Sequence, residues 1–219
     1  MRVNLDAQSL WALKAVMGFD NISSNSTPGG NVFINSSSSI TAATVQTWLD
    51  GDSAPTTGQR RTYIGIAKGG TSQSALMPGV TQGYDPDPFR GDNGFCPVTF
   101  KAGDIDTAGY PSSGFVFTYP AAWFTVDAAA NPNADVEATY QASTGGIYQS
   151  GFWNDPNNTT AGIGKAALVN YEPQGASAHG RVVFMGFHPL YRAQPEGSYL
   201  LVARQILLAA ATPPEMPTR

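Results

Sequence analysis

The segment from Gly180 to Ala211 constrains the fold more than any other part of this sequence. It opens with a nearly continuous apolar run, GRVVFMGF. A short run of this kind is typical of a strand that is buried on both faces inside a parallel sheet. Pro189 ends the run, because proline has no N–H to donate to the strand ladder. His188 therefore falls at the carboxyl end of a buried strand, where doubly wound α/β proteins carry functional groups.

A helix is expected directly after this strand and its linker LYRAQPEG. The residues SYLLVARQILLAAA combine a plausible N-cap, Ser198, with apolar residues at helical spacing. The predicted apolar stripe consists of Leu200, Ala203, Leu207 and Ala211.

The first third of the chain alternates helix and strand patterns. Helices are predicted over 5–17 and over 42–49, the second with Thr41 as N-cap. Strands are predicted at the apolar runs NVFINS and TYIGIA, with a shorter one at FDNIS. This order predicts a three-layer α/β fold with a mostly parallel sheet between helices.

The middle of the chain is rich in Gly, Pro, Asn and Asp. Residues 78–165 are predicted to form a β-rich insertion over one edge of the sheet. Its strand candidates are Val98–Phe100, Phe115–Tyr119, Trp123–Val126 and Val136–Tyr140. A further strand is expected at Ala166–Tyr171. We interpret residues 1–219 as a single domain that ends in a tail over 212–219.

The composition narrows the possible surroundings and partners. Charged residues are only 13% of the chain, about half the usual share, as in many secreted bacterial proteins. Twelve Lys and Arg residues with a net charge of −4 offer no basic footprint for nucleic acid. No apolar stretch reaches the length of a membrane span. Cys96 is the only cysteine, so no internal disulfide forms, and we expect a small buried hydrophobe there.

The end of the strand TYIGIA carries a glycine pattern, Gly65-Ile66-Ala67-Lys68-Gly69. Such spacing is typical of the sharp turn that exposes a nucleophile between a strand and a helix. Here Ala67 stands at the centre, and its methyl group cannot attack a substrate. Taken alone, the pattern is interpreted as a turn, and a lone His188 as a general base or as a hydrogen-bonded strand end.

Taken together, these strand ends resemble the type 1 glutamine amidotransferases. Those enzymes place a catalytic Cys in the first turn and a His and a Glu in a late strand end, Phe-His-Pro-Glu. In YIGIAKGG and VFMGFHPLY only His188 matches, whereas Ala67 and Leu190 replace the Cys and the Glu. The resemblance therefore implies vestigial catalytic positions at Ala67, His188 and Leu190, and no amidotransferase activity.

The terminal segment is similar, more narrowly, to amidotransferase-like domains at the C-terminal side of secreted zinc carboxypeptidase-like proteins (peptidase family M14). The similarity lies in Gly180–Val183, Gly186-Phe187, Pro189, Tyr191-Arg192, Gln194 and Gly197–Leu201. It implies a flavodoxin-like fold, an extracellular location, and a pseudoenzyme role as an accessory domain. It also implies a zinc peptidase domain upstream as partner. We expect no catalysis in this chain because Ala67 replaces the nucleophile, and no zinc or other cofactor because His179 and His188 lack zinc-ligand spacing.

The same resemblance and strand ends define where a ligand would bind. The candidate pocket consists of Lys68, Gly69, Gly70, His188, Arg192 and Gln194. The expected tasks are packing on the peptidase domain, or binding of a peptide, a cell-wall polymer or another carbohydrate. The first ten residues lack a signal-peptide layout, so we expect the chain to be part of a longer secreted protein.

Three alternatives remain open at the level of sequence. An independent hydrolase would use His188 as base and Ser72 as a displaced nucleophile, with Lys68 or Arg192 holding an anion. A carbohydrate-binding module would use Trp123 and Trp153. Finally, Asp85, Asp87 and Asp92 lie close together in a Gly-rich stretch, which fits either a calcium loop or a cluster of turns.

Overall fold

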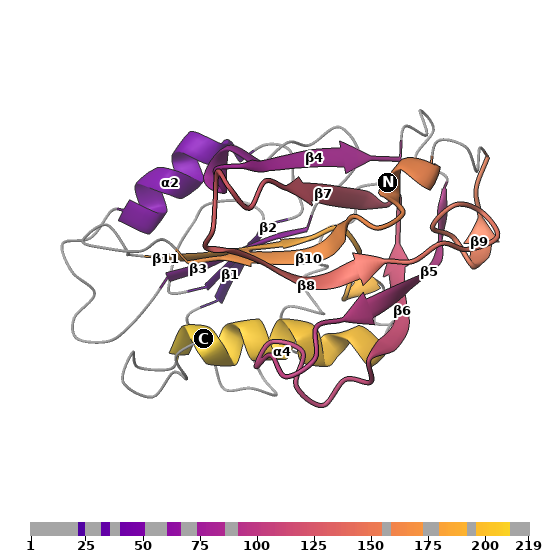
Figure 1. The fold of residues 1–219 in the computed structure, drawn as a ribbon. Coiled ribbons are helices and arrows are strands. Elements are labelled where there is room, and N and C mark those ends of the chain that lie inside the picture. Colours follow the sequence, from indigo (N-terminus) through magenta and orange to yellow (C-terminus); the bar gives the residue numbers. More distant parts are fainter. Residues whose placement is uncertain are drawn as a thin grey trace.

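A single mixed sheet with one helix on each face organises the described part of the chain (Figure 1). The structure is a computed structural model that describes residues 22–24, 32–35, 40–50, 61–66, 74–85, 92–154, 159–172, 180–191 and 196–210. The strands are β1 (Ile22–Ser24), β2 (Val32–Asn35), β3 (Arg61–Ile66), β4 (Val80–Tyr84), β5 (Asn93–Phe100), β6 (Ser113–Thr118), β7 (Ala122–Val126), β8 (Ala134–Tyr140), β9 (Ser150–Phe152), β10 (Ala166–Tyr171) and β11 (Gly180–Met185). The helices are α2 (Ala42–Asp50), α4 (Glu196–Ala210) and the short 3-10 turns η1 (Ser74–Leu76) and η2 (Thr160–Gly162).

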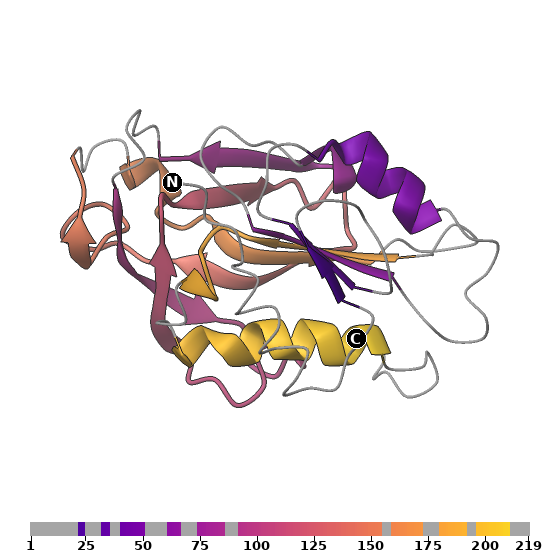
Figure 2. The same cartoon turned by 180° about the vertical axis from the view of Figure 1, so that it is seen from behind.

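The predicted three-layer α/β fold is confirmed, and its sheet is mixed. The main path of the sheet runs β1-β2-β3-β11-β10-β8-β5-β6. Its first four strands are parallel to one another. From β11 onward every described pairing is antiparallel. The predicted parallel character therefore holds for the first half of this path, whose strands lie between α2 and α4 in the view from behind (Figure 2).

The parallel half is buried on both faces because its strands are almost entirely apolar. Along β3, Tyr63 points into the hydrophobic cluster under α2, whereas its neighbour Ile64 points into the cluster under α4. Val45 and Leu49 of α2 fill the first cluster. Successive residues of β3 point to opposite faces, and both faces are buried. The run RTYIGI is therefore largely apolar and does not alternate between apolar and polar residues.

Helix α2 begins as the sequence predicts. The hydroxyl oxygen of Thr41 accepts a hydrogen bond from the backbone N–H of Thr44, at 3.1 Å. This bond satisfies one of the donors that a helix leaves unpaired at its start.

Helix α4 differs from its prediction in both start and orientation. It begins at Glu196, so Ser198 lies inside the helix and its hydroxyl donates to the carbonyl of Pro189 at 2.7 Å. Leu200 and Leu207, on the stripe predicted to face the core, are 45% and 50% exposed. The buried residues are Ser198, Leu201, Val202, Gln205 and Ile206. The helix is apolar around most of its circumference, so periodicity alone does not define the buried face.

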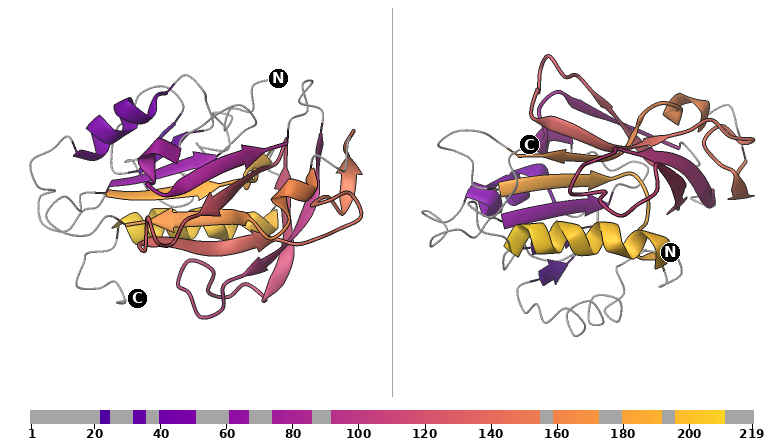
Figure 3. Two further views of the ribbon diagram at one scale, coloured as in Figure 1. Left: turned by 45° about the horizontal axis from the view of Figure 1, so that its top comes forward. Right: turned by 60° about the horizontal axis from the view of Figure 1, so that its bottom comes forward.

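The predicted insertion contains the four expected strands, but it does more than cover an edge. Strands β5, β6 and β8 continue the main sheet beyond β10. Strands β4 and β7 pair with each other and form a ribbon on the α2 side of the sheet (Figure 3). Val80 and Phe124 of this ribbon belong to the same hydrophobic cluster as α2. The middle of the chain is thus an integral part of the core.

Several sequence predictions lie outside the described residues. These are the helix over 5–17, the turn over 67–70 and the tail over 212–219. No helix in the described ranges has the length and apolar character that a membrane crossing requires.

Candidate functional site

Strands β3 and β11 bring the two predicted strand ends together. The strands are parallel neighbours, and Ile66 pairs with Met185 at their carboxyl ends. The turn that contains Ala67, Lys68, Gly69 and Gly70 lies outside the described residues, as do Arg192 and Gln194. Of the candidate pocket, the structure therefore places His188, together with the vestigial position Leu190.

His188 is built into the strand end rather than presented to solvent. It is 2% exposed, and its backbone N–H donates to the carbonyl of Phe117 on β6 at 2.7 Å. Its ring meets the ring of Tyr191 edge to face, with centroids 6.3 Å apart. Leu190 beside it is buried as well. This environment favours the interpretation of His188 as part of the packing at the end of β11.

Gly186 ties the strand end to the antiparallel half of the sheet. Its N–H donates to the carbonyl of Ala167, and its own carbonyl accepts from the N–H of Ala122 and the hydroxyl of Tyr140. A Cβ atom at this position would overlap the carbonyl oxygen of Ala122. The chain needs a glycine here because two backbones cross at van der Waals contact.

Cys96 cannot supply the thiolate that Ala67 lacks. As predicted, it is a buried residue of the core, on β5. Its sulfur lies 3.5 Å from the hydroxyl of Thr118. Burial raises the pKa of the Cys96 thiol to about 12, against a smaller lowering by the Thr118 hydrogen bond. The thiolate is the nucleophilic form of cysteine, so this side chain is unreactive near neutral pH.

The two tryptophans of the carbohydrate alternative pack against the protein itself. Trp123 is 6% exposed, and its ring covers Gly83 and Gly162. Trp153 is half-buried and stacks on Tyr148, with centroids 5.6 Å apart and an interplanar angle of 5°. The carbohydrate alternative needs an exposed ring at Trp123, and the structure instead buries this ring against Gly83 and Gly162.

Asp85 and Asp92 act as buried hydrogen-bond acceptors. The Asp85 carboxylate accepts from the hydroxyl of Tyr148 at 3.0 Å, and Asp92 accepts from the backbone N–H of Asn154 at 3.0 Å. Both fasten the loop region near β9 to the body of the sheet. Asp87, the third member of the calcium alternative, lies outside the described residues.

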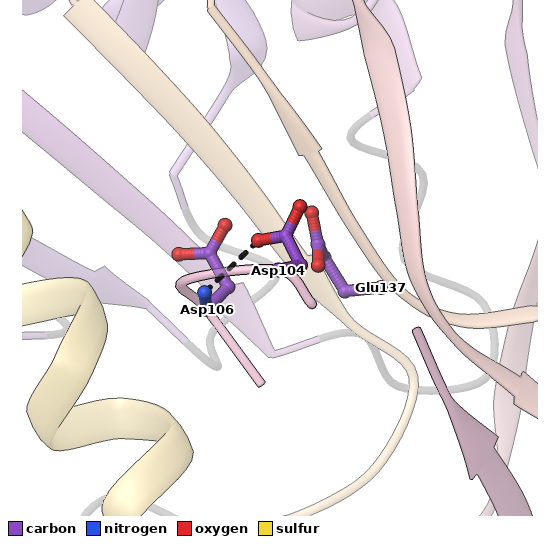
Figure 4. A group of neighbouring side chains, drawn as sticks. All are labelled: Asp104, Asp106 and Glu137. Atoms are coloured by element: carbon purple, nitrogen blue, oxygen red, sulfur yellow. Dashed lines mark hydrogen bonds between the residues drawn. The ribbon is translucent and has the colours of Figure 1, made fainter. Parts of the chain in front are cut away.

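A second group of polar residues, which the sequence analysis did not single out, lies between α4 and the sheet. Asp104, Asp106 and Glu137 each offer a carboxylate oxygen within 4.8 Å of the others (Figure 4). The two aspartates belong to a turn over 101–110, and Glu137 belongs to β8. Asp106 and Glu137 are fully buried. Arg181 within the apolar run GRVVFM was the one available signal, because a buried cation requires an acidic partner.

Asp106 is the centre of this buried cluster. Its carboxylate accepts from the guanidinium of Arg181 at 2.6 Å, from the amide of Asn170 at 2.7 Å and from the amide of Gln205 at 3.3 Å. These partners come from β11, β10 and α4. The cluster therefore joins the turn over 101–110, the sheet and α4 into one network.

Glu137 has an unusual acidity for a carboxylic acid. Burial, first of all, and the nearby charges of Asp106, Asp104 and Asp135 together raise its pKa to about 9, against an opposing effect of Lys101. Asn170 donates to its Oε1 at 2.8 Å. Both effects, burial and the nearby negative charges, favour the uncharged form of this buried side chain.

An aromatic face covers the outer surface of β5, β6 and β9. Phe95 pairs with Phe117 across the β5–β6 ladder, and their ring centroids are 5.5 Å apart. Tyr191 stacks on Phe117 at 4.9 Å. Phe115 and Phe152 on the same side are 58% and 57% exposed. We call Phe95, Phe115, Phe117, Phe152 and Tyr191 the aromatic face.

Comparison with known proteins returns solved structures only. No family model matches the chain, and no curated protein matches it. The chain is similar to a proposed GMP synthase component from Thermoplasma acidophilum, at 12% identity and a TM-score of 0.49, over 83% of this chain and 73% of that one. It is also similar to a proposed ThuA-like protein from Bacteroides uniformis, at 11% identity and a TM-score of 0.46, over 84% and 73% of the two chains.

A third solved structure is a glutamine amidotransferase from Thermotoga maritima, at 10% identity and a TM-score of 0.39. The similarity spans 83% of this chain and 76% of that one. All three similarities describe the path of the backbone and not the chemistry of a site.

Proposed function

We propose that this chain is a non-catalytic, amidotransferase-like accessory domain of a secreted zinc carboxypeptidase-like protein. The resemblance of the segment around Gly180–Leu201 to such domains supports this proposal. The observation that carries its non-catalytic part is the state of Cys96. The single thiol of the chain is buried on β5 with a pKa raised to about 12, while alanine occupies the position of the nucleophile after β3.

The aromatic face is the surface that we assign to packing on the peptidase domain of the same protein. Phe95, Phe115 and Phe152 are each about half exposed, and Phe115 and Phe152 are the two most exposed large apolar side chains among the described residues. A contiguous exposed apolar patch on a soluble protein marks a surface for protein contact. The absence of charge on all five side chains suits a permanent interface between domains.

The first experiment is to sequence the reading frame on both sides of the region that encodes this chain. The proposal expects an upstream domain with His-x-x-Glu and a later His, the ligands of a catalytic zinc. A reading frame without any such domain would overturn the accessory role.

The second experiment measures the interface and the lack of chemistry in the same samples. In the longer protein, Phe115→Ser with Phe152→Ser should expose protease sites between the domains, whereas Leu207→Ser on the exposed side of α4 should not. Glutamine hydrolysis should be absent in every variant, and native Cys96 should resist alkylation until the chain unfolds. Measurable hydrolysis that disappears in His188→Gln would instead support the independent hydrolase.

A further inference from the structure

The buried cluster contains more acid than base. Its five carboxylates are Asp104, Asp106, Asp135, Glu137 and Glu172. Two cations contact them: Lys101 bridges Asp104 and Asp135, and Arg181 bridges Asp106 and Glu172. Arg204 on α4 lies next to the cluster, and its guanidinium donates to the carbonyl of Ile105. With Arg204 counted, full ionisation would leave two surplus negative charges around a site whose centre is buried, which is costly in a medium of low dielectric constant.

The hydrogen bonds decide which carboxyl group is neutral. Asp106 accepts three hydrogen bonds, one from the cationic guanidinium of Arg181 and one each from the amides of Asn170 and Gln205. Asp104 accepts from the ammonium of Lys101 and from the backbone N–H of Asp106, each at 3.0 Å. Glu137 is fully buried beside these two aspartates and accepts a hydrogen bond from the uncharged amide of Asn170. The proton is therefore least costly to keep on Glu137.

We propose that Glu137 carries a proton at neutral pH, and that this proton locks the turn over 101–110 and helix α4 onto the sheet. The pKa of about 9, which burial and the neighbouring carboxylates give this side chain, agrees with the geometry. A metal ion is the less suitable neutraliser, because the oxygens of Asp106 are already engaged by three donors. The lock is a property of the fold and does not depend on the proposed accessory role.

The lock acts on α4 through the turn. Gln205 binds Asp106, Arg204 binds the carbonyl of Ile105 at 2.9 Å, and the hydroxyl of Tyr110 donates to the carbonyl of Gly197 at 2.6 Å. Loss of the Glu137 proton places a third negative charge beside Asp104 and Asp106. The resulting repulsion pushes the turn away from β8 and so weakens the seat of the helix.

The loosening also reaches the strand end. Ser198 on α4 holds the carbonyl of Pro189, which directly follows His188. The end of β11 should therefore loosen together with the helix, so the proton on Glu137 and the environment of His188 are coupled through α4.

The test is hydrogen exchange of the full chain across pH, corrected for the intrinsic rate of each amide. Protection of amides in 101–110 and α4 should fall by up to about tenfold for each pH unit between pH 6 and pH 9, and then level off. Glu137→Gln should remove this dependence, because its amide cannot ionise. Asp135→Asn is the matched control: it removes a nearby charge but keeps Glu137, so the dependence should remain with a lower midpoint.

Three results would overturn the lock. The first is equal loss of protection in the wild type and in Glu137→Gln. The second is a wild type whose protection in these segments does not change with pH. The third is a wild-type response that millimolar Mg²⁺ or Ca²⁺ abolishes, which would show that a metal and not a proton neutralises the cluster. A carbon-13 titration of the Glu137 carboxyl group checks the site directly: the lock requires a midpoint above neutrality, and a midpoint near that of free glutamate contradicts it.

Discussion

Several residues of types that are common in catalytic sites have structural roles in this protein. Glu137 is an acid that is kept neutral, Cys96 is a thiol that is kept unreactive, and His188 is an imidazole that is packed into a strand end. For Glu137 and Cys96, burial decides the chemistry, because the charged form of a side chain is disfavoured away from water. The residue types that usually announce a catalytic site are therefore part of the core here.

The pH dependence of stability should report Glu137. Its pKa is raised from 4.5 to about 9 in the folded chain, so the folded state binds a proton that the unfolded state has already lost at intermediate pH. The free energy of unfolding should accordingly fall as pH rises from about 5 to about 9, by at most about 1.4 kcal/mol per pH unit, and change little above that range.

Urea titrations at several pH values measure this slope. In Glu137→Gln the slope should be smaller, and at pH 8 the variant should be more stable than the wild type. A variant that is less stable than the wild type at pH 8 would show that Glu137 is ionised in the folded chain.

Gly186 should tolerate no side chain. Gly186→Ala places a methyl group against the carbonyl of Ala122, and relief requires a shift of backbone. We expect a loss of about 3 kcal/mol, at the upper end of overpacking effects. Chemical denaturation measures it against Gly197→Ala in α4, where a Cβ meets nothing within 4 Å and the better helix propensity of alanine should leave stability equal or higher.

At the scale of elements, the sheet changes character at one strand. β11 is parallel to β3 on one side and antiparallel to β10 on the other. β10 in turn pairs with β7, β8 and β11, so the middle of the chain is fastened to the parallel half through it. Helix α4 spans this junction, with its buried face on the cluster that contains Ile64, Val183 and Leu168.

The orientation of α4 gives a direct comparison between two leucines. Leu201 is fully buried, whereas Leu207 is 50% exposed. Leu201→Ala should cost about 2–5 kcal/mol through lost burial and a cavity, and Leu207→Ala less than about 0.5 kcal/mol. Thermal or urea unfolding distinguishes them. Equal losses at both positions would mean that the helix is rotated from the orientation described.

Some elements could be predicted from sequence because one physical signal dominates them. Strands β2, β3 and β11 are short apolar runs between turn residues, and Thr41 is a typical N-cap. The face of α4 could not be predicted, because apolar residues surround the helix. The acidic cluster was missed because Asp106, Glu137 and Arg181 lie far apart in sequence, and only the sheet register brings them together.

At the scale of the whole molecule, two hydrophobic clusters share the same strands. Alternate residues of β2, β3, β10 and β11 feed the cluster under α2 and the cluster under α4. Neither cluster can lose its packing while the other keeps its own, because the strands between them are common. The described part of the chain thus behaves as one cooperative unit.

Unfolding should therefore occur in one transition. Urea midpoints followed by far-ultraviolet circular dichroism and by fluorescence should coincide, although Trp48 lies on the α2 side and Trp123 in the cluster under α4. Single-tryptophan variants that keep either Trp48 or Trp123 allow the fluorescence change of each cluster to be measured separately. Two well-separated midpoints would show that the parallel and antiparallel halves unfold independently.

The position of β11 in the sheet has a consequence for synthesis on the ribosome. Gly180 pairs with Arg61, so β3 leaves the exit tunnel long before its neighbour exists. Until β11 is made, one edge of β3 exposes unpaired N–H and C=O groups between two apolar faces. Such an edge can pair with a strand of another nascent chain and start aggregation. β11 is synthesised late and inserts between β3 and β10, which joins the two halves of the sheet. Slow translation across the middle of the gene would prolong the time for which the edge of β3 is exposed. Chaperones that bind the nascent chain would reduce aggregation during that time.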